Sequence, residues 1–140
     1  MEINLETRTN VIVRYAETDK MGIVHHSNYP VWFEAGRTEF IKKAGIKYSQ
    51  IEETGLFLPL IKLECSYKKP AFYEDELVIK TKIGEYTMTR ISFFYEVLRS
   101  GENEMLASGK TFHVWTGRDL KPLNLKKHFP QIYELISKNL

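Results

Sequence analysis

The sequence predicts an α+β fold in which an antiparallel five-stranded sheet wraps around one long central helix. Three observations predict it: one long helical segment near the start of the chain, four consecutive strand-like segments after it, and turn residues between those strands. One helix and consecutive antiparallel strands form an α+β fold in which the helix covers one face of the sheet. At 140 residues, 43% of them hydrophobic, the chain can bury one sizeable core, so residues 1–140 are expected to form one domain.

The first strand is expected at residues 10–15, because Val11, Val13 and Tyr15 alternate with other positions and would share one face. A loop follows, with the sequence TDKMGIVHHSNY over residues 18–29. It contains one carboxylate, one glycine and two adjacent histidines, and it leads directly into an aromatic helical segment. This loop holds most of the candidate functional residues.

The long helix is expected over residues 30–44. Ser27 or Asn28 can cap its start, a proline is tolerated in its first turn, and Gly45 ends it. The helical spacing gives one broad face with Gly36 in its middle, where a strand of the sheet can approach closely. The residues of this face are Phe33, Gly36, Arg37, Phe40 and Ala44.

The remaining elements complete the sheet. A short helix is expected from Ser49, which begins a capping-box pattern, to about Gly55. After residue 57 the hydrophobic period becomes two, which is typical of strands. Four strands are expected, at residues 58–69, 75–84, 89–98 and 104–116, and a terminal helix at residues 130–138. This element order is that of the hotdog fold, whose exposed strand edges favour pairing with a second subunit.

The composition narrows the classes of function. A net charge of +2 with both signs interspersed lacks the basic stripe of a nucleic-acid-binding protein. The single cysteine, Cys65, excludes an internal disulfide and a cysteine-built zinc site, and its alternating surroundings predict a buried thiol. Residues 1–4 begin no signal-peptide pattern, and no apolar stretch approaches the ~20 residues of a membrane span. The expected location is the cytoplasm.

Three familiar motifs are not supported. The segment Ser108–Thr111 resembles the end of a phosphate loop, but the pattern requires a glycine where Glu104 stands. No Gly-x-Ser-x-Gly elbow is present. Asp19 with His25 and His26 suggests a metal site, but adjacent side chains are expected to point in different directions, and no further ligand is clustered with them. The sequence therefore predicts neither a metal nor a cofactor.

Asp19 leaves two interpretations open. An aspartate in a loop commonly makes a local turn. Alternatively, its carboxylate lies beside the N-terminus of the long helix, where free N–H groups stabilise a developing oxyanion. These two parts suit thioester hydrolysis, because the leaving thiolate has a conjugate acid with a pKa of about 8.5 and needs little protonation. A carboxylate that activates water or attacks directly is then sufficient.

The stretch YAETDKMGIVHHSNY at residues 15–29 is followed by WFE at residues 32–34 and RTE at residues 37–39. This combination resembles the 4-hydroxybenzoyl-CoA thioesterase-like family, whose relatives include the acyl-CoA thioesterases associated with bacterial Tol-Pal genes. The order of elements extends the resemblance over almost the whole chain. It implies a homodimer or homotetramer of hotdog subunits, with acyl-CoA bound across a subunit interface.

The resemblance also implies roles for individual residues. Asp19 matches the catalytic aspartate, as nucleophile or general base, and the backbone N–H of His26 matches the group that polarises the thioester carbonyl. The imidazole of His26 either positions substrate or hydrogen-bonds the loop backbone. The implied catalytic residues are Asp19 and His26, and the implied substrate-binding residues are Gly22, His25, Asn28 and Tyr29.

Three further charged residues remain open. Arg37 and Glu39 match the family pattern, either as an ion pair that braces the helix or in a catalytic role. Glu64 is a candidate for the site only if its face of the strand points toward the subunit interface. The candidates for binding the phosphates of coenzyme A are Lys68, Lys69, Arg90 and Lys110, with no spacing rule to choose among them.

The implied function is hydrolysis of a small acyl-CoA, with a short-chain or aromatic acyl group, to the free acid and coenzyme A. The alternatives are an acyl-ACP thioesterase, or a non-catalytic acyl-CoA-binding hotdog protein, against which the intact Asp19 argues. A hydratase of this fold resembles a pattern with Asn-Pro after the aspartate and a histidine five residues on. His25 and His26 fall six and seven residues after Asp19, so the spacing argues against a hydratase.

Overall fold

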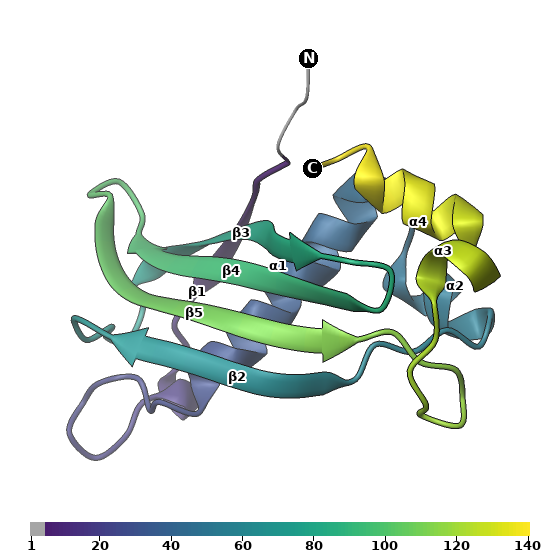
Figure 1. Ribbon diagram of the computed structural model, residues 1–140. Helices are drawn as coiled ribbons and strands as arrows, with labels where there is room; N and C mark the ends of the chain where they lie inside the picture. The colour runs from purple at the N-terminus through teal and green to yellow at the C-terminus, as the bar shows by residue number, and fades with distance from the viewer. Residues whose placement is uncertain (1–4) are drawn as a thin grey trace.

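The computed structural model, which describes residues 5–140, has five antiparallel strands curved around one long helix (Figure 1). The spatial order of the strands is β1-β3-β4-β5-β2, so β1 and β2 are the edges of the sheet. This arrangement confirms the predicted α+β architecture. The strands are β1 (Thr7–Ile12), β2 (Leu60–Tyr67), β3 (Glu76–Tyr86), β4 (Arg90–Arg99) and β5 (Glu104–Val114).

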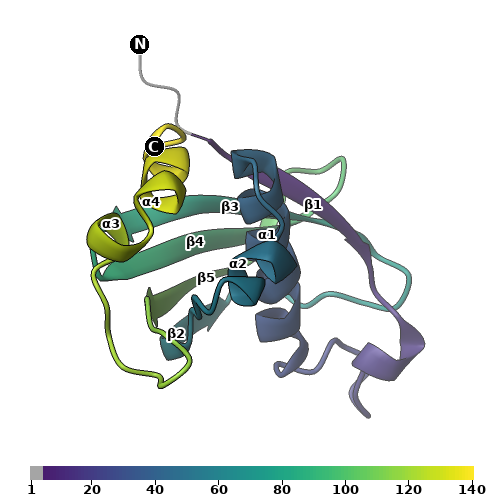
Figure 2. The same cartoon turned by 90° about the vertical axis from the view of Figure 1, so that its right-hand side faces the viewer.

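The helices cover the concave face and one end of the sheet. The long helix α1 lies inside the curve of the sheet, and the short helices gather at one end of it (Figure 2). The helices are α1 (Asn28–Ala44), α2 (Tyr48–Glu53), α3 (Leu125–His128) and α4 (Pro130–Ser137), with the 3₁₀ turn η1 at Tyr15–Glu17. Gly45, at φ +124°, ends α1 as predicted. No helix within residues 5–140 is long and apolar enough to cross a membrane.

The first strand differs from its prediction. β1 pairs with β3 only as far as Ile12, and the chain then folds into η1 because the Glu17 carboxylate accepts the Arg14 backbone N–H at 2.7 Å. Val13 is buried as expected, but Tyr15 is 77% exposed and does not share its face. The segment considered for a leader, residues 1–4, lies outside the described residues.

Two helical details also differ from the sequence prediction. α2 begins one residue before Ser49, and Gln50 Oε1 accepts the Lys47 N–H at 3.2 Å, so the expected capping box at Ser49 is wrong. The four-residue helix α3 was not expected, because it is too short to produce a hydrophobic period.

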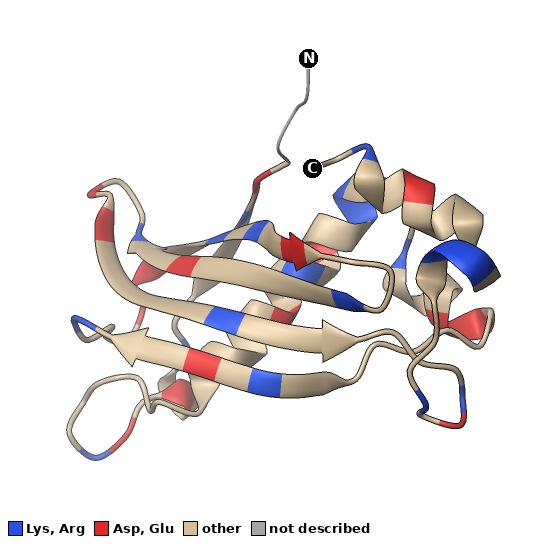
Figure 3. Cartoon of the chain, viewed as in Figure 1, with Lys and Arg blue, Asp and Glu red and all other residues tan. Residues whose placement is uncertain are grey.

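Charged residues of both signs are interspersed along the strands of the sheet (Figure 3). On the face of the sheet that points away from α1, Lys62 pairs with Glu64 at 3.0 Å, and Lys110 lies over the Phe94 ring at 4.9 Å. No single-sign stripe forms there, which agrees with the charge pattern of the sequence.

Helix α1 packs closely against the sheet at Gly36. A Cβ at this position would overlap Thr81 Oγ1 and would lie 3.3 Å from Ile79 Cγ2. One turn earlier, the Phe33 ring stacks on Tyr95 with ring centroids 4.4 Å apart. The predicted close approach of helix and sheet at Gly36 is therefore confirmed.

A buried row of polar groups crosses the sheet under α1. The Tyr95 hydroxyl lies 2.6 Å from Thr111 Oγ1, which lies 2.9 Å from His113 Nε2, and His113 Nδ1 is 3.4 Å from the Leu58 carbonyl oxygen. The imidazole is almost fully buried. Burial lowers the pKa of His113 to about 4, and the positive charge of Arg37 acts in the same direction. His113 is therefore neutral at physiological pH.

We expect Gly36→Ala to lower the free energy of unfolding by about 1–3 kcal/mol, because the added methyl group overpacks the contact with Thr81. Helix propensity alone would instead raise stability by about 1 kcal/mol, so the sign separates the two effects. Urea unfolding measures the change. The double variant Gly36→Ala/Thr81→Ala should recover much of the loss, because it removes the overlapping hydroxyl, which makes no hydrogen bond of its own within residues 5–140. A more stable Gly36→Ala variant would contradict the close contact.

His113 makes the stability of the protein depend on pH. Its folded pKa is about 4, below the ordinary value of about 6.5, so the unfolded state binds the proton more readily. Stability should be fully present above about pH 6.5 and should fall by roughly 3 kcal/mol as the pH decreases toward 4. Urea unfolding across this range measures the slope. His113→Gln should remove it, whereas His128→Gln, at an exposed histidine, should leave it unchanged.

Candidate active site

The loop between η1 and α1 folds into a tight turn at Asp19. Asp19 N–H donates to the Ile23 carbonyl at 2.8 Å, Gly22 N–H donates to the Asp19 carbonyl at 2.9 Å, and Asp19 Oδ1 accepts the Met21 N–H at 2.8 Å. Gly22 has φ +84°, a conformation that other residues rarely adopt. The local turn anticipated for Asp19 is therefore present, and it fixes one carboxylate oxygen.

The two histidines lie together after this turn. Their ring centroids are 4.1 Å apart, so the expectation that adjacent side chains diverge is wrong. His25 N–H donates to the Glu17 carbonyl at 2.9 Å, and its Nδ1 lies 2.8 Å from Ser27 Oγ. No group of three potential metal ligands is found among residues 5–140.

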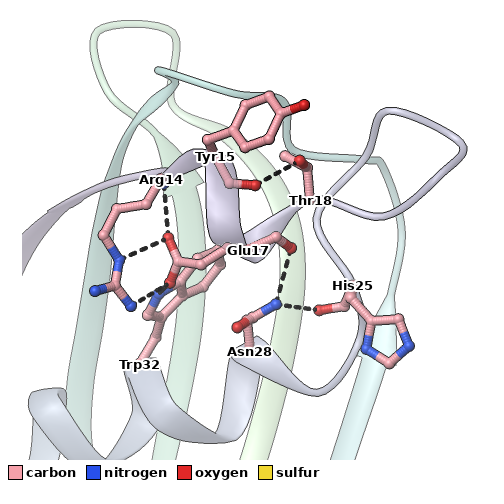
Figure 4. A network of polar contacts seen from close by, with 7 residues as sticks. All are labelled: Arg14, Tyr15, Glu17, Thr18, His25, Asn28 and Trp32. Atoms are coloured by element: carbon pink, nitrogen blue, oxygen red, sulfur yellow. Dashed lines mark hydrogen bonds and ion pairs between the residues drawn. The ribbon is translucent and has the colours of Figure 1, made fainter.

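Asn28, at the first position of α1, ties the loop to the helix (Figure 4). Its Nδ2 donates to the Glu17 carbonyl at 2.9 Å and to the His25 carbonyl at 3.1 Å. Ser27 is the N-cap residue by position, but its side chain makes no capping hydrogen bond. Asn28 therefore shapes the loop, and it does not line the cavity described next.

A cavity of about 380 Å³ opens between the loop, the start of α1 and the end of β2. Asp19 and His26 line it from the loop, Tyr29 from the helix, and Tyr67 from the strand, with Lys68 and Lys69 just beyond. Three of the six predicted site residues, Asp19, His26 and Tyr29, therefore meet at one cavity. Gly22, His25 and Asn28 lie outside its wall.

A larger cavity, about 640 Å³, contains no residue of this loop. Its wall includes Leu5, Leu140, Lys82 from β3 and Phe94 from β4. Size alone does not identify the reactive site, because only the smaller cavity combines a carboxylate with a helix N-terminus.

The backbone around His26 is arranged to leave one donor free. The His26 carbonyl accepts the Tyr67 hydroxyl at 3.1 Å and the Tyr29 N–H at 3.4 Å, whereas the His26 N–H has no acceptor within residues 5–140. This N–H lies at the positive end of α1. Partial burial, together with the neighbouring Cys65 thiol, raises the pKa of Tyr67 to about 12, so its hydroxyl stays protonated as a donor. A free N–H of this kind can hold an oxyanion.

The other charged candidates lie apart from the cavity. Glu64 faces the convex side of the sheet and pairs with Lys62. Arg37 lies 3.9 Å from Glu34 and 3.5 Å from the Tyr95 hydroxyl, and no ion pair joins it to Glu39. Residues two apart on a helix point to different sides, so the expected ion pair is wrong.

The structure also corrects the expectation for Cys65, and it adds residues that sequence reasoning missed. Cys65 is half-buried rather than buried, and burial raises the pKa of its thiol. Tyr67 was missed as a wall of the cavity, because the alternation of β2 does not reveal which side chains reach a loop far away in sequence. Glu17 was missed as the partner of Trp32 for the same reason, although a charged residue inside the quoted motif was a signal.

Comparison with known proteins places this geometry in context. The family model for the thioesterase-like superfamily matches residues 13–131. The chain is 37% identical over 125 residues to a putative acyl-CoA thioesterase, YneP, of Bacillus subtilis, covering 89% of this chain and 90% of the relative. It is 39% identical over 101 residues to a putative esterase of Aquifex aeolicus, covering 72% of this chain and 77% of the relative.

Solved structures of thioesterases are also similar to this chain. A DHNA-CoA thioesterase from Staphylococcus aureus superposes with a TM-score of 0.90 at 36% identity, covering 95% of this chain and 89% of that one. A 4-hydroxybenzoyl CoA thioesterase superposes with a TM-score of 0.81 at 19% identity, covering 93% of this chain and 97% of that one, which establishes the shared fold alone.

Proposed function

The chain belongs to the thioesterase-like superfamily and is an acyl-CoA thioesterase, and we propose that it acts on a small acyl-CoA, with a short-chain or aromatic acyl group. The products are the free acid and coenzyme A. The observation that most strongly supports the proposed site is that Asp19 and His26, the residue with the free N–H, line the same cavity. Tyr29 and Tyr67 give that cavity a partly aromatic wall, which suits a flat acyl group.

The proposed chemistry follows from these two groups. Asp19 either takes a proton from a water molecule that attacks the thioester carbon, or attacks that carbon itself and is released by water. The negative charge that develops on the carbonyl oxygen meets the His26 N–H at the positive end of α1. The C–S bond then breaks, and coenzyme A leaves as a thiolate that takes up a proton afterwards. No general acid is required.

The turn at Asp19 prepares its carboxylate for this role. Oδ1 is held by the Met21 N–H at 2.8 Å, while Oδ2 has no partner within residues 5–140. The fixed oxygen orients the group, and the other oxygen is available for substrate or water. Gly22 contributes by permitting the turn rather than by touching substrate.

Coenzyme A carries phosphates, and the cavity has cations at its rim. Lys68 and Lys69 line it at the end of β2, and Lys69 is also paired with Glu104 at 2.9 Å. Among the basic candidates we favour Lys68 for the phosphates, because Arg90 and Lys110 lie outside the wall of this cavity. Since acyl-CoA thioesters are metabolites of the cytoplasm, we propose that the protein acts there.

Replacing Asp19 with asparagine keeps its volume but removes both the base and the nucleophile. We expect kcat to fall by about 10²–10⁴-fold, with KM and the unfolding midpoint little changed. Release of free thiol from a panel of acyl-CoAs of graded length, a benzoyl type and an acyl-ACP measures both constants and identifies the carrier. Asp119→Asn, at an exposed turn remote from the cavity, is the matched control and should keep full activity. If Asp19→Asn kept activity within about twofold of the wild type, the role of Asp19 would be limited to forming the local turn.

The edge strand β2 supports a proposal on assembly. Its outer backbone groups have no partner strand within residues 5–140, and three apolar side chains along it are exposed: Ile61 by 52%, Leu63 by 39% and Tyr67 by 49%. Exposed apolar edges of this kind favour pairing with another chain. We propose that two copies pair along β2, beside the catalytic cavities, as a homodimer that can assemble further into a homotetramer.

Introducing charge at this edge should separate the subunits. The variant Ile61→Lys/Leu63→Lys is expected to sediment as a monomer at micromolar concentration, because buried lysines at a paired edge are unfavourable. Analytical ultracentrifugation measures the mass. Leu120→Lys changes a more exposed leucine, outside the strands of the sheet, and should leave the assembly intact. A monomeric wild type that is fully active would contradict the proposed interface.

A further inference from the structure

Glu17 is a buried carboxylate that the proposed reaction does not use (Figure 4). The residue is 4% exposed and lies outside the wall of the catalytic cavity. Its Oε1 accepts the Arg14 N–H at 2.7 Å, and its Oε2 accepts the Trp32 Nε1–H at 3.1 Å. The Arg14 guanidinium adds an ion pair, with Nε 3.5 Å from Oε1. A buried charge is tolerated only where such partners offset its lost hydration, so this arrangement has a specific structural purpose.

The backbone of the same residue holds the catalytic loop. The Glu17 carbonyl accepts the His25 N–H at 2.9 Å and the Asn28 Nδ2–H at 2.9 Å. Glu17 stands two residues before Asp19, and His25 stands directly before His26. One residue therefore connects the segment that carries the carboxylate to the segment that carries the free N–H.

We propose that Glu17 is a positioning residue, which fixes the separation between the Asp19 carboxylate and the His26 N–H. Its side chain is held by the hydrogen bond from Trp32, in the second turn of α1. Its carbonyl oxygen, which accepts the two bonds from the loop, therefore keeps the loop in place relative to α1. The anchor is rigid, because Trp32 is 4% exposed and packs against Tyr29 with ring centroids 4.9 Å apart. The inference rests on the proposed function, in which both groups act on one thioester.

A carboxylate is suited to this task because two donors reach it from different elements. Arg14 N–H comes from the residue directly before η1, and Trp32 Nε1–H comes from α1, so each needs its own oxygen. A glutamine at position 17 has a single side-chain oxygen and leaves one of these donors without its acceptor. Catalytic groups must be held within about 0.5 Å of their productive geometry, so a small shift of the loop is sufficient to reduce the rate.

The first test is Glu17→Gln, assayed by thiol release. We expect kcat to fall by about 10- to 100-fold, with KM within about twofold and with the shape of the pH profile retained. The same substitution should cost less in a Trp32→Phe background, because phenylalanine removes one of the two donors and the single oxygen then serves Arg14. Additive losses would show that Glu17 does not act through Trp32. Loss of the acidic limb of the profile would make Glu17 the proton acceptor itself and would overturn the positioning role.

A control variant separates positioning from general destabilisation. Ile136→Val removes a buried methyl group from α4, which contributes no residue to the loop or to the wall of the catalytic cavity, and well below its unfolding midpoint it should keep kcat within about twofold of the wild type. An equal loss of kcat in Ile136→Val would assign the effect of Glu17→Gln to stability alone. A Glu17→Gln variant with wild-type kcat would likewise refute the proposal.

Hydrogen exchange tests the positioning role of Glu17 without an activity assay. In Glu17→Gln we expect the amides of residues 18–27 to exchange about tenfold faster than in the wild type, while those of β3 and β4 keep their rates. Unchanged exchange in the loop would overturn the inference even if the protein is an active thioesterase. A wild type that hydrolyses no thioester would instead refute the proposed function, so the two failures are distinguishable.

Discussion

The close contact of α1 with the concave face of the sheet is the constraint on which the rest of the structure depends. Gly36 lets the helix axis approach β3 at Thr81, and Phe33 stacks on Tyr95 one turn earlier. These contacts fix the height and the rotation of α1 over the sheet. They therefore determine where its N-terminus emerges, and with it the position of the His26 N–H relative to the end of β2. A helix held farther from the sheet would separate the walls of the cavity.

The candidate active site lies in one short loop beside this helix–sheet contact, and hydrogen bonds to backbone groups hold that loop in place. The turn at Asp19 holds its own carboxylate, Asn28 joins the loop to the helix, and Tyr67 reaches across from β2 to the His26 carbonyl. Backbone groups are well suited to hold an oxyanion, because their positions are fixed before substrate arrives. The Glu17 carbonyl accepts two of the bonds that hold the loop, from the His25 N–H and the Asn28 Nδ2–H. In the role that we propose, the buried charge of Glu17 positions the Asp19 carboxylate without taking part in the chemistry.

Sequence periodicity predicted most of the fold, since it reports directly on which side chains face a core. The four later strands, the long helix and its end at Gly45 were all predicted to within a few residues. The errors lie where local chemistry replaces periodicity. Tyr15 continues an alternating pattern but lies in a turn, because the Glu17 carboxylate captures the backbone N–H of Arg14. The ion pair expected between Arg37 and Glu39 fails because the two side chains point to different sides of α1.

The sequence by itself determined the α+β class, the loop with its carboxylate, and the resemblance that identified Asp19 and His26 as the residues of interest. Only the tertiary structure decided which residues surround that loop. It brought Tyr67 from β2 to the cavity, removed Gly22, His25 and Asn28 from its wall, and joined the Glu17 carboxylate to an indole fifteen residues away. The physical reason is that periodicity records whether a side chain is buried, whereas its neighbours depend on strand order and on how closely the helix packs.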